Sequence, residues 1–266
     1  MRIDRLLLTG AAGGLGRVLR GRLKPYATTL RLSDRVPLGE ALPGEELVAC
    51  DLADATAVRN LLADVDAVVH MGGISLEGPF EPILQSNIVG VYNLYEAARR
   101  NAVKRIVFAS SNHVSGFRRQ GERIDTEDTM RPDGLYAVSK CFGENLSRFY
   151  YDRYGIETVC LRIGSSFPEV RDRRMLSTFL SYDDLVELVR CALFAASPGH
   201  TVIYGMSENS QAWWDNAKAA HLGFRPRDSA DAQRSRVEAQ SPALDPGDPA
   251  AIYQGGAFVR AGPFEN

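Results

Sequence analysis

The stretch Arg5-Leu-Leu-Leu-Thr9-Gly10-Ala-Ala-Gly13-Gly14-Leu15-Gly16 decides the fold of this chain. It begins as a short continuous apolar run, which is typical of a strand buried on both faces of a parallel sheet. The glycines follow at once, spaced Gly-x-x-Gly-x-x-Gly, and a helical stretch over 17–23 comes next. Such a turn lets the backbone approach a pyrophosphate, whose charge the helix dipole favours. The pattern favours a dinucleotide-binding turn over an ordinary strand–helix turn.

Further short apolar runs alternate with helical stretches along the rest of the chain. The order strand, helix, strand predicts an α/β fold of Rossmann type, a doubly wound parallel sheet with right-handed crossovers. After residue 166 the periodicity weakens, so we expect a dinucleotide-binding part over 1–166 and a small substrate-binding portion over 167–266, within one compact unit. The expected strands are 5–9, 29–33, 47–50, 67–70, 105–110 and 158–163, with a late strand at 202–204.

Composition excludes several classes of function. The 266 residues carry a net charge of −2 and a pI near 6.1, which gives no electrostatic footprint for nucleic acid or an anionic membrane. The four cysteines show no metal-ligand spacing and indicate buried thiols of a reducing compartment, and we expect no metal. We expect no signal peptide or membrane span, and therefore a cytoplasmic protein.

Acidic residues at the ends of the second and third strands indicate how a dinucleotide would bind. Asp34 lies about twenty positions beyond the glycine turn, where a carboxylate accepts from both adenosine ribose hydroxyls. It would repel a 2′-phosphate, so NAD is favoured over NADP, although the adjacent Arg35 can partner a phosphate. Asp51 is expected near the adenine edge, or alternatively as a helix N-cap.

Small and polar residues follow the later strands at the edge where ligands bind in open α/β sheets. The turn Met71-Gly72-Gly73-Ile74-Ser75 follows the fourth strand, and Ser111 follows the fifth. Ser165 follows the sixth strand. Asn87 lies in a helix expected over 82–101, either as a plain surface amide or as a water-holding group near a lysine.

The segment Tyr136-Ala-Val-Ser-Lys140 places a phenol and an ammonium on one face of a helix. A nearby fixed cation favours the phenolate, so we expect Lys140 to lower the pKa of Tyr136 and bring its proton transfer closer to working pH. Alone, the spacing is also that of a surface helix with one half-buried aromatic side chain.

Taken together, these motifs resemble the extended short-chain dehydrogenase/reductase superfamily over roughly residues 5 to 165. The motifs are the Gly10/Gly13/Gly16 pattern, Asp34, Asn87, Ser111 and the Tyr136–Lys140 pair. The resemblance implies NAD as the cofactor, bound by Gly10, Gly13, Gly14, Leu15, Gly16, Asp34, Arg35, Asp51, Leu52, Met71, Gly72, Gly73, Asn87, Lys140 and Ile163.

Other segments resemble the uronate dehydrogenases over nearly the whole chain. They are Ser110-Ser-Asn-His113, Arg131-Pro-Asp-Gly-Leu-Tyr136, Val138-Ser-Lys-Cys-Phe-Gly-Glu-Asn145, Arg173-Arg-Met-Leu-Ser-Thr178, Trp213-Trp-Asp-Asn216 and Gln254-Gly-Gly-Ala-Phe258. The resemblance implies oxidation of galacturonate or glucuronate at C1 to an aldarolactone. Tyr136 would be the base, Lys140 would bind the nicotinamide ribose, and Ser111 would hold the reacting oxygen.

A uronate also needs a cation for its carboxylate. Arg174 is the expected partner, because a guanidinium grips a carboxylate with two parallel hydrogen bonds. Arg171 and Arg173 are close neighbours, so this choice leans on the resemblance, and a solvated basic turn is the alternative. Ser75, Ser111, Asn112, His113 and Ser165 are expected to bind the sugar, with a structural role as the alternative for His113. Phe258 is expected either to close over the sugar or to anchor the C-terminus.

Two other functions compete with this interpretation. A sugar-nucleotide epimerase or dehydratase shares the cofactor half, but grips a nucleotide diphosphate with a larger C-terminal lobe. A non-catalytic NAD-sensing Rossmann protein commonly lacks the tyrosine or lysine that this chain keeps. We expect an enzyme acting on a small free sugar acid, and a homo-oligomer paired through the helices near 82–101 and 136–153.

Overall fold

Strand β1 (Ile3–Thr9) forms because its three consecutive leucines are buried on both sides of a sheet. The computed structural model describes residues 2–264, and Leu6, Leu7 and Leu8 are all fully buried in it. Leu6 and Leu8 belong to one hydrophobic cluster, while Leu7 belongs to another. Because successive side chains of a strand point to opposite faces, β1 separates two cores.

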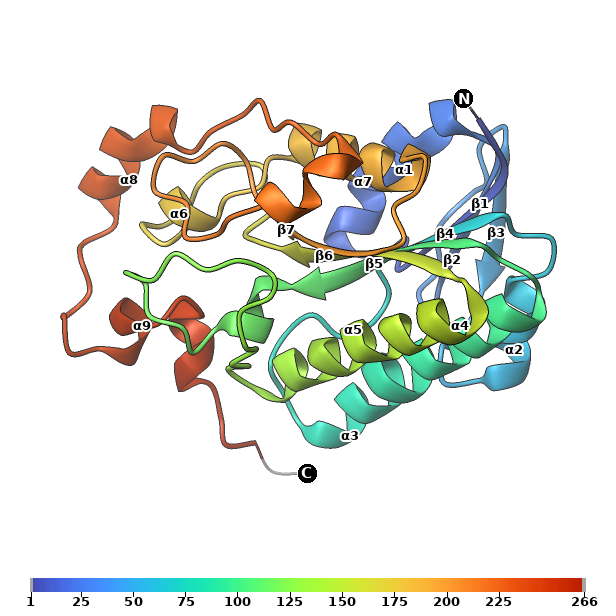
Figure 1. Ribbon diagram of the computed structural model, residues 1–266, viewed down its shortest axis with the longest axis horizontal. Coiled ribbons are helices and arrows are strands. Elements are labelled where there is room, and N and C mark those ends of the chain that lie inside the picture. The colour runs from blue at the N-terminus through green and yellow to red at the C-terminus, as the bar shows by residue number, and fades with distance from the viewer. Residues whose placement is uncertain (1, 265–266) are drawn as a thin grey trace.

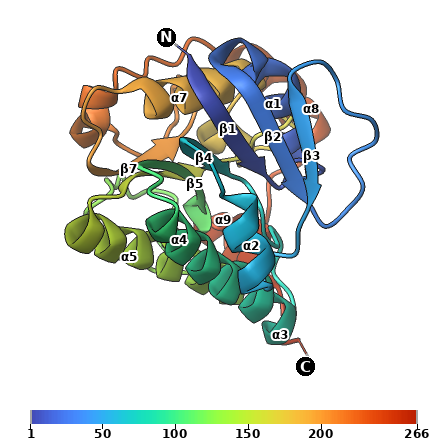
Figure 2. The same ribbon diagram turned by 90° about the vertical axis from the view of Figure 1, so that its right-hand side faces the viewer.

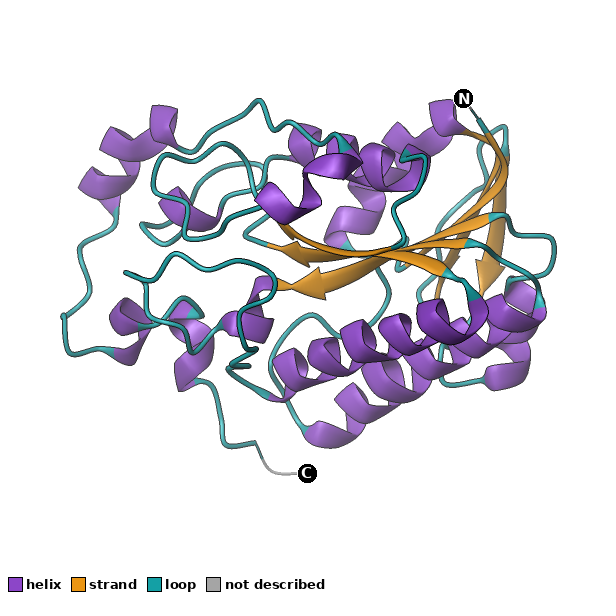
Figure 3. Cartoon of the chain, in the orientation of Figure 1, coloured by secondary structure: helices purple, strands orange, loops and turns teal. Residues whose placement is uncertain are grey.

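Within residues 2–264, seven strands pair in parallel in the order β3-β2-β1-β4-β5-β6-β7. Figure 3 shows the strands as one sheet with helices packed around it. The predicted doubly wound parallel sheet is therefore confirmed. The chain moves outward from β1 to β3 and then returns to β4, so the carboxyl ends of β1 and β4 flank the position where ligands bind in such sheets. The other strands are β2 (Ala27–Asp34), β3 (Glu45–Ala49), β4 (Ala67–His70), β5 (Arg105–Ser111), β6 (Glu157–Ile163) and β7 (His200–Gly205).

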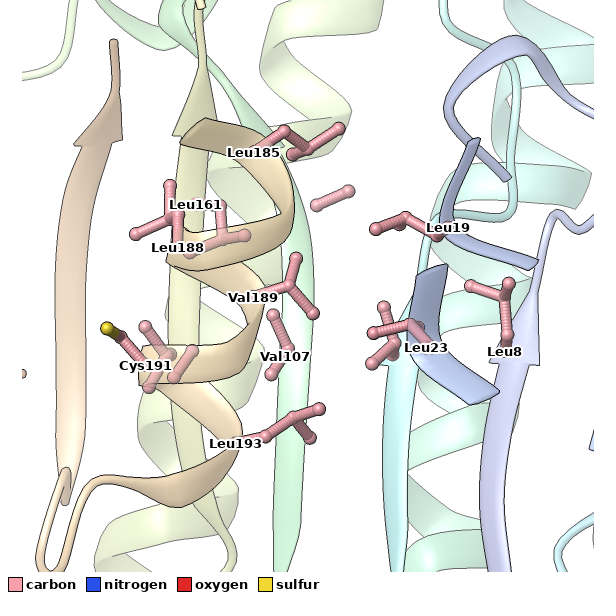
Figure 4. Close-up of a cluster of buried hydrophobic side chains, with 14 of the residues drawn as sticks. Leu8, Leu19, Leu23, Val107, Leu161, Leu185, Leu188, Val189, Cys191 and Leu193 are labelled. Atoms are coloured by element: carbon pink, nitrogen blue, oxygen red, sulfur yellow. The ribbon is translucent and has the colours of Figure 1, made fainter. Parts of the chain in front are cut away.

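Helices cover both faces of the sheet (Figures 1 and 2). On one face lie α1 (Gly14–Leu23) and α7 (Tyr182–Phe194), whose leucines pack over β1, β5 and β6 (Figure 4). On the other face lie α2 (Ala55–Leu61), α4 (Gly90–Arg100) and α5 (Leu135–Tyr154). Helix α5 ends at Tyr154, and Gly155 after it adopts the left-handed conformation that commonly terminates helices.

The single helix expected over 82–101 is interrupted. The structure has a short α3 (Phe80–Ile83), then a π-helical segment at Leu84–Val89, and only then α4. Asn87 lies in the π-helical segment and is buried. Single π-helical turns of this kind often occur at functional sites.

The C-terminal portion completes the sheet with β7 and covers the carboxyl ends of the strands (Figure 1). The fully buried Gln254 anchors it, because its Nε2 donates to the carbonyls of Arg119 and Glu122, and its Oε1 accepts from Trp214. The remaining helices are α6 (Met175–Thr178), α8 (Arg234–Gln240) and α9 (Pro249–Ile252), with 3-10 helices at Lys24–Tyr26, Asn112–Ser115, Ala217–Leu222, Asp231–Gln233 and Gly256–Arg260.

Cys50, Cys160 and Cys191 are buried free thiols, as expected, whereas Cys141, on α5, is only half-buried. Between residues 2 and 264, no helix is both long enough and apolar enough to cross a membrane.

Candidate active site

A cavity of about 980 Å³ runs along the carboxyl ends of the strands. All but one of the predicted site residues line it, which agrees with the position expected from the strand order. The lining includes Gly10, Gly13, Gly14, Leu15, Gly16, Asp34, Arg35, Asp51, Leu52, Met71, Gly72, Gly73, Ser75, Ser111, Asn112, His113, Tyr136, Lys140, Ile163, Ser165, Arg174 and Phe258.

The glycine turn forms one end of this cavity. Gly10 has φ +70°, and a Cβ atom there would lie 2.5 Å from the Met71 backbone. A Cβ atom at Gly16 would overlap the Gly10 carbonyl oxygen, whereas one at Gly14 would meet nothing within 4 Å. Gly10 and Gly16 therefore allow close packing of β1, β4 and α1, and Gly14 leaves the face of the turn open. These features fit the pyrophosphate of a dinucleotide.

Two carboxylates lie beside the turn. Asp34 ends β2, and its oxygens accept from the backbone N–H groups of Ala12 at 3.0 Å and Val36 at 3.1 Å. Asp51 accepts from the backbone of Ala53 at 2.9 Å. The alternative role of Asp51 as a helix N-cap is wrong, because Asp54 caps α2.

Asn87 is the predicted site residue that does not line the cavity. Its amide donates to the Ile74 carbonyl at 2.9 Å and to Ser139 Oγ at 3.0 Å, and its Oδ1 accepts from the Ile74 backbone at 2.8 Å. Asn87 thus ties the turn after β4 to α5. The alternative of a surface amide is wrong, because the Asn87 side chain is buried.

Ser111, Tyr136 and Lys140 meet where β5 and α5 approach each other. Lys140 Nζ donates to the Ala109 carbonyl at 2.8 Å and lies 5.6 Å from the centre of the Tyr136 ring. Burial raises the pKa of Tyr136 to about 12, although a hydrogen bond with Ser111 opposes this shift. Burial likewise lowers the pKa of Lys140 to about 8. The pKa of Tyr136 is therefore raised and not lowered as expected, because desolvation of the phenolate is the largest cause of its shift.

The N-terminus of α5 is capped from a distance. The two oxygens of Glu77 accept from the backbone N–H groups of Leu135 and Tyr136, each at 2.9 Å. A Cβ atom at Gly134 would overlap this carboxylate, so glycine makes room for the contact. Because Ser75 and Leu76 line the cavity, Glu77 joins the loop beside the substrate end of the cavity to the helix that carries Tyr136.

Arg174 is the arginine of its cluster that faces the cavity. Its Nε donates to the Gln254 carbonyl at 2.6 Å and its Nη1 to Ser165 Oγ at 3.2 Å. When the Asn112 amide is oriented to satisfy its neighbours, its side-chain oxygen accepts from Arg174 Nη2 at 2.6 Å. A guanidinium has five N–H donors, so each terminal nitrogen keeps one for a ligand. Burial lowers the pKa of Arg174 to about 10, and no carboxylate between residues 2 and 264 forms a salt bridge with it.

The two neighbouring arginines point elsewhere. Arg171 lies over the Phe167 ring at 4.1 Å, and Arg173 donates to the carbonyls of Glu238 and Ser241. Both are exposed, so Arg174 is the member of the cluster placed to meet an anion in the cavity.

His113 lies between α5 and the C-terminal segment. Its Nδ1 is 2.7 Å from Asp133 Oδ2, and its ring stacks on Phe258 with 3.9 Å between the ring centres. The Tyr136 ring lies in an edge arrangement with the imidazole, with 6.2 Å between the ring centres. Burial lowers the pKa of His113, and Asp133 opposes that shift. Phe258 lines the cavity and joins the C-terminal segment to His113 through this stacking contact.

Sequence reasoning missed Glu77, Asp133 and Gln254 as parts of the site. Asp133 and Gln254 belong to the segments 131–136 and 254–258, which resemble those of uronate dehydrogenases. The sequence therefore indicates that these segments matter, but it does not show which contacts the two side chains make. Glu77 gave no local signal, because the helix that it caps begins 58 residues later.

Comparisons with known proteins agree with this geometry. The model of the NAD dependent epimerase/dehydratase family matches residues 6–183. A uronate dehydrogenase from Pseudomonas putida is 59% identical over 98% of this chain and 97% of its own length. The glucuronic acid dehydrogenase from Chromohalobacter salexigens has a TM-score of 0.96 at 54% identity over 98% of each chain. A mutant uronate dehydrogenase from Agrobacterium tumefaciens complexed with NAD has a TM-score of 0.97 at 52% identity over 99% of each chain.

Proposed function

This chain belongs to the NAD dependent epimerase/dehydratase family and, within it, to the uronate dehydrogenases, and we propose that it oxidises galacturonate and glucuronate at C1 to the aldarolactone. The observation that carries the choice of substrate is Arg174. Its guanidinium is largely enclosed by protein, faces the cavity and forms no salt bridge among the described residues, although Asp172 and Asp133 act on it electrostatically from beyond salt-bridge distance. A buried cation without a directly paired carboxylate is costly, and an anionic substrate group in contact with it would reduce that cost.

The cofactor end of the cavity fits NAD. The glycine turn would hold the pyrophosphate, Asp34 the adenosine ribose, and Lys140 the nicotinamide ribose. NAD supplies the hydride acceptor. The two backbone N–H groups that bind Asp34 hold its carboxylate at the end of β2, where it would repel a 2′-phosphate.

In this proposal Tyr136 takes the proton of the C1 hydroxyl as the C1 hydrogen leaves as hydride. Ser111 holds the reacting oxygen next to the phenol, and the remaining donors of Arg174 hold the carboxylate at the other side of the sugar. Ser75, Asn112, His113 and Ser165 bind the hydroxyls, and Phe258 covers the sugar. Ser165 and Asn112 also orient Arg174, so substrate contacts and arginine placement depend on the same side chains.

A screen of NAD reduction tests the proposal. We expect NADH to appear with galacturonate and glucuronate and not with neutral aldoses or UDP-sugars. The variant Tyr136→Phe should lose about 10²–10⁴-fold in turnover while it still binds NADH, because only proton transfer is removed. Faster oxidation of neutral aldoses than of uronates would refute the role of Arg174. Parental turnover by Tyr136→Phe would refute the role of Tyr136.

A further inference from the structure

Asp133 is a buried carboxylate beside the cavity that the proposed chemistry does not use directly. Its side chain is fully buried, and one of its oxygens lies 2.7 Å from His113 Nδ1. Its other oxygen, Oδ1, is also buried and has no hydrogen-bond partner among residues 2–264. An unpaired buried carboxylate oxygen costs free energy, so a gain elsewhere must offset it.

The surroundings of Asp133 are shaped to hold a carboxylate. A Cβ atom at Gly116 or at Gly255 would overlap Oδ2 of Asp133, so both backbones approach this carboxylate only because they are glycines. The Gly255 N–H donates to the Gly116 carbonyl at 2.8 Å, which joins the two segments around the carboxylate. Three segments far apart in sequence therefore fix the position of Asp133.

The contact with Asp133 decides which nitrogen of His113 carries hydrogen. An ionised carboxylate only accepts, so Nδ1 holds the hydrogen and a neutral ring has its lone pair on Nε2. Nε2 has no partner among the described residues, and His113 lines the cavity. Stacking on Phe258 and the edge contact with Tyr136 restrict rotation of the ring.

We propose that Asp133 is a positioning residue for substrate recognition, which holds His113 so that its Nε2 lone pair accepts a hydrogen bond from one hydroxyl of the sugar. This inference rests on the proposed function. The two sides of the sugar site then favour different groups of the substrate. Arg174 only donates and attracts the uronate carboxylate, whereas the lone pair on His113 Nε2 repels that carboxylate and favours a hydroxyl. The two side chains together fix one orientation of the uronate.

A cycle of substitutions in the protein and in the substrate tests this role. Galacturonate and its 2-, 3- and 4-deoxy derivatives are compared with the wild-type enzyme, Asp133→Leu and Asp133→Asn. The wild type should lose about 3- to 10-fold in kcat/KM with one derivative, the loss expected for a single hydrogen bond. Asp133→Leu should discriminate little between that derivative and galacturonate, and Asp133→Asn, which keeps an accepting oxygen, should recover part of the discrimination. The KM for NAD should stay within about twofold, since Asp133 acts through His113, which faces the sugar in this proposal and not the cofactor.

Asp184→Asn is the matched control, because Asp184 is a buried carboxylate outside the cavity that accepts from the backbones of Arg227 and Asp228. It should keep wild-type discrimination even if it lowers stability. Discrimination that is unchanged in both Asp133 variants would overturn the inference. If neither variant folds, nitrogen NMR of wild-type histidines decides: His113 should carry hydrogen on Nδ1, and hydrogen on Nε2 would overturn the inference. Failure of the wild type to oxidise any uronate would instead refute the proposed function.

Discussion

The two ends of the cavity are built in different ways. The cofactor end consists largely of consecutive residues in turns that follow strands, such as 10–16 after β1 and 71–73 after β4. The substrate end consists of side chains from segments far apart, and its central cation is held by the carbonyl of Gln254, 80 residues away. Backbone groups of a turn depend little on the surrounding side chains, apart from the glycines such as Gly10 and Gly16 that the turn itself requires, whereas an assembled set of side chains depends on every supporting contact. We therefore expect the two ends to be separable by mutation.

Arg174→Met should give the largest separation. Removing a charge-assisted contact in an enclosed site costs about 2–5 kcal/mol, so kcat/KM for uronates should fall by about 30- to 4,000-fold. NADH affinity, measured by fluorescence titration, should be nearly unchanged. Arg173→Met is the matched control, because Arg173 is exposed and binds only two carbonyls outside the cavity. An equal loss of NADH affinity in Arg174→Met would show that the ends are not independent.

Lys140 lies where the two ends meet. Replacing it should raise the stability of the folded protein while it abolishes turnover. Burial lowers its pKa from 10.5 to about 8, so the unfolded chain binds more protons than the folded protein between these values. Stability conferred at this position therefore rises with pH across that window and is lowest below pH 8. Lys140→Met should lose turnover, yet be more stable at pH 7 by on the order of 2 kcal/mol, with a gap that closes toward pH 10.5.

Urea unfolding of Lys140→Met and the wild type at several pH values measures this gap. Lys104→Met, which changes an exposed lysine, corrects for general effects of charge. A less stable Lys140→Met at pH 7 would contradict the prediction.

Glu77→Ala should disturb the substrate end through the catalytic helix. It removes both acceptors at the start of α5, which should lower stability by about 1–2 kcal/mol. Because Tyr136 is one of the two capped residues, kcat should fall by about tenfold while KM for NAD is retained. Asp54→Ala provides the control, since Asp54 caps α2 with the same chemistry but away from Tyr136. If both variants lose stability and neither loses kcat, Glu77 serves only the helix.

Asp34→Asn should give the smallest effect, confined to the cofactor end. Loss of the charge should raise KM for NAD by about tenfold and reduce the preference over NADP, with the KM for uronate unchanged. Steady-state kinetics with both cofactors measure this effect. A preference for NAD that persists in Asp34→Asn would mean that another group excludes the 2′-phosphate.

Periodicity and spacing were sufficient to predict the sheet, the glycine turn, the position of Asp34 at the end of β2, and the shared face of Tyr136 and Lys140. Each of these depends on neighbours within one or two elements, where alternation and turn chemistry are visible in the chain itself. The carboxyl ends of parallel strands meet at one edge, so the position of the cavity followed from the strand order.

Only the tertiary structure decided the rest. A π-helical segment turned Asn87 inward, packing selected Arg174 from three adjacent arginines, and Glu77 reached a helix that begins 58 residues later. Enclosure by the folded protein also raised the pKa of Tyr136, where the sequence had suggested that Lys140 would lower it. Desolvation and side-chain direction depend on what other segments enclose, and local sequence carries no record of those segments.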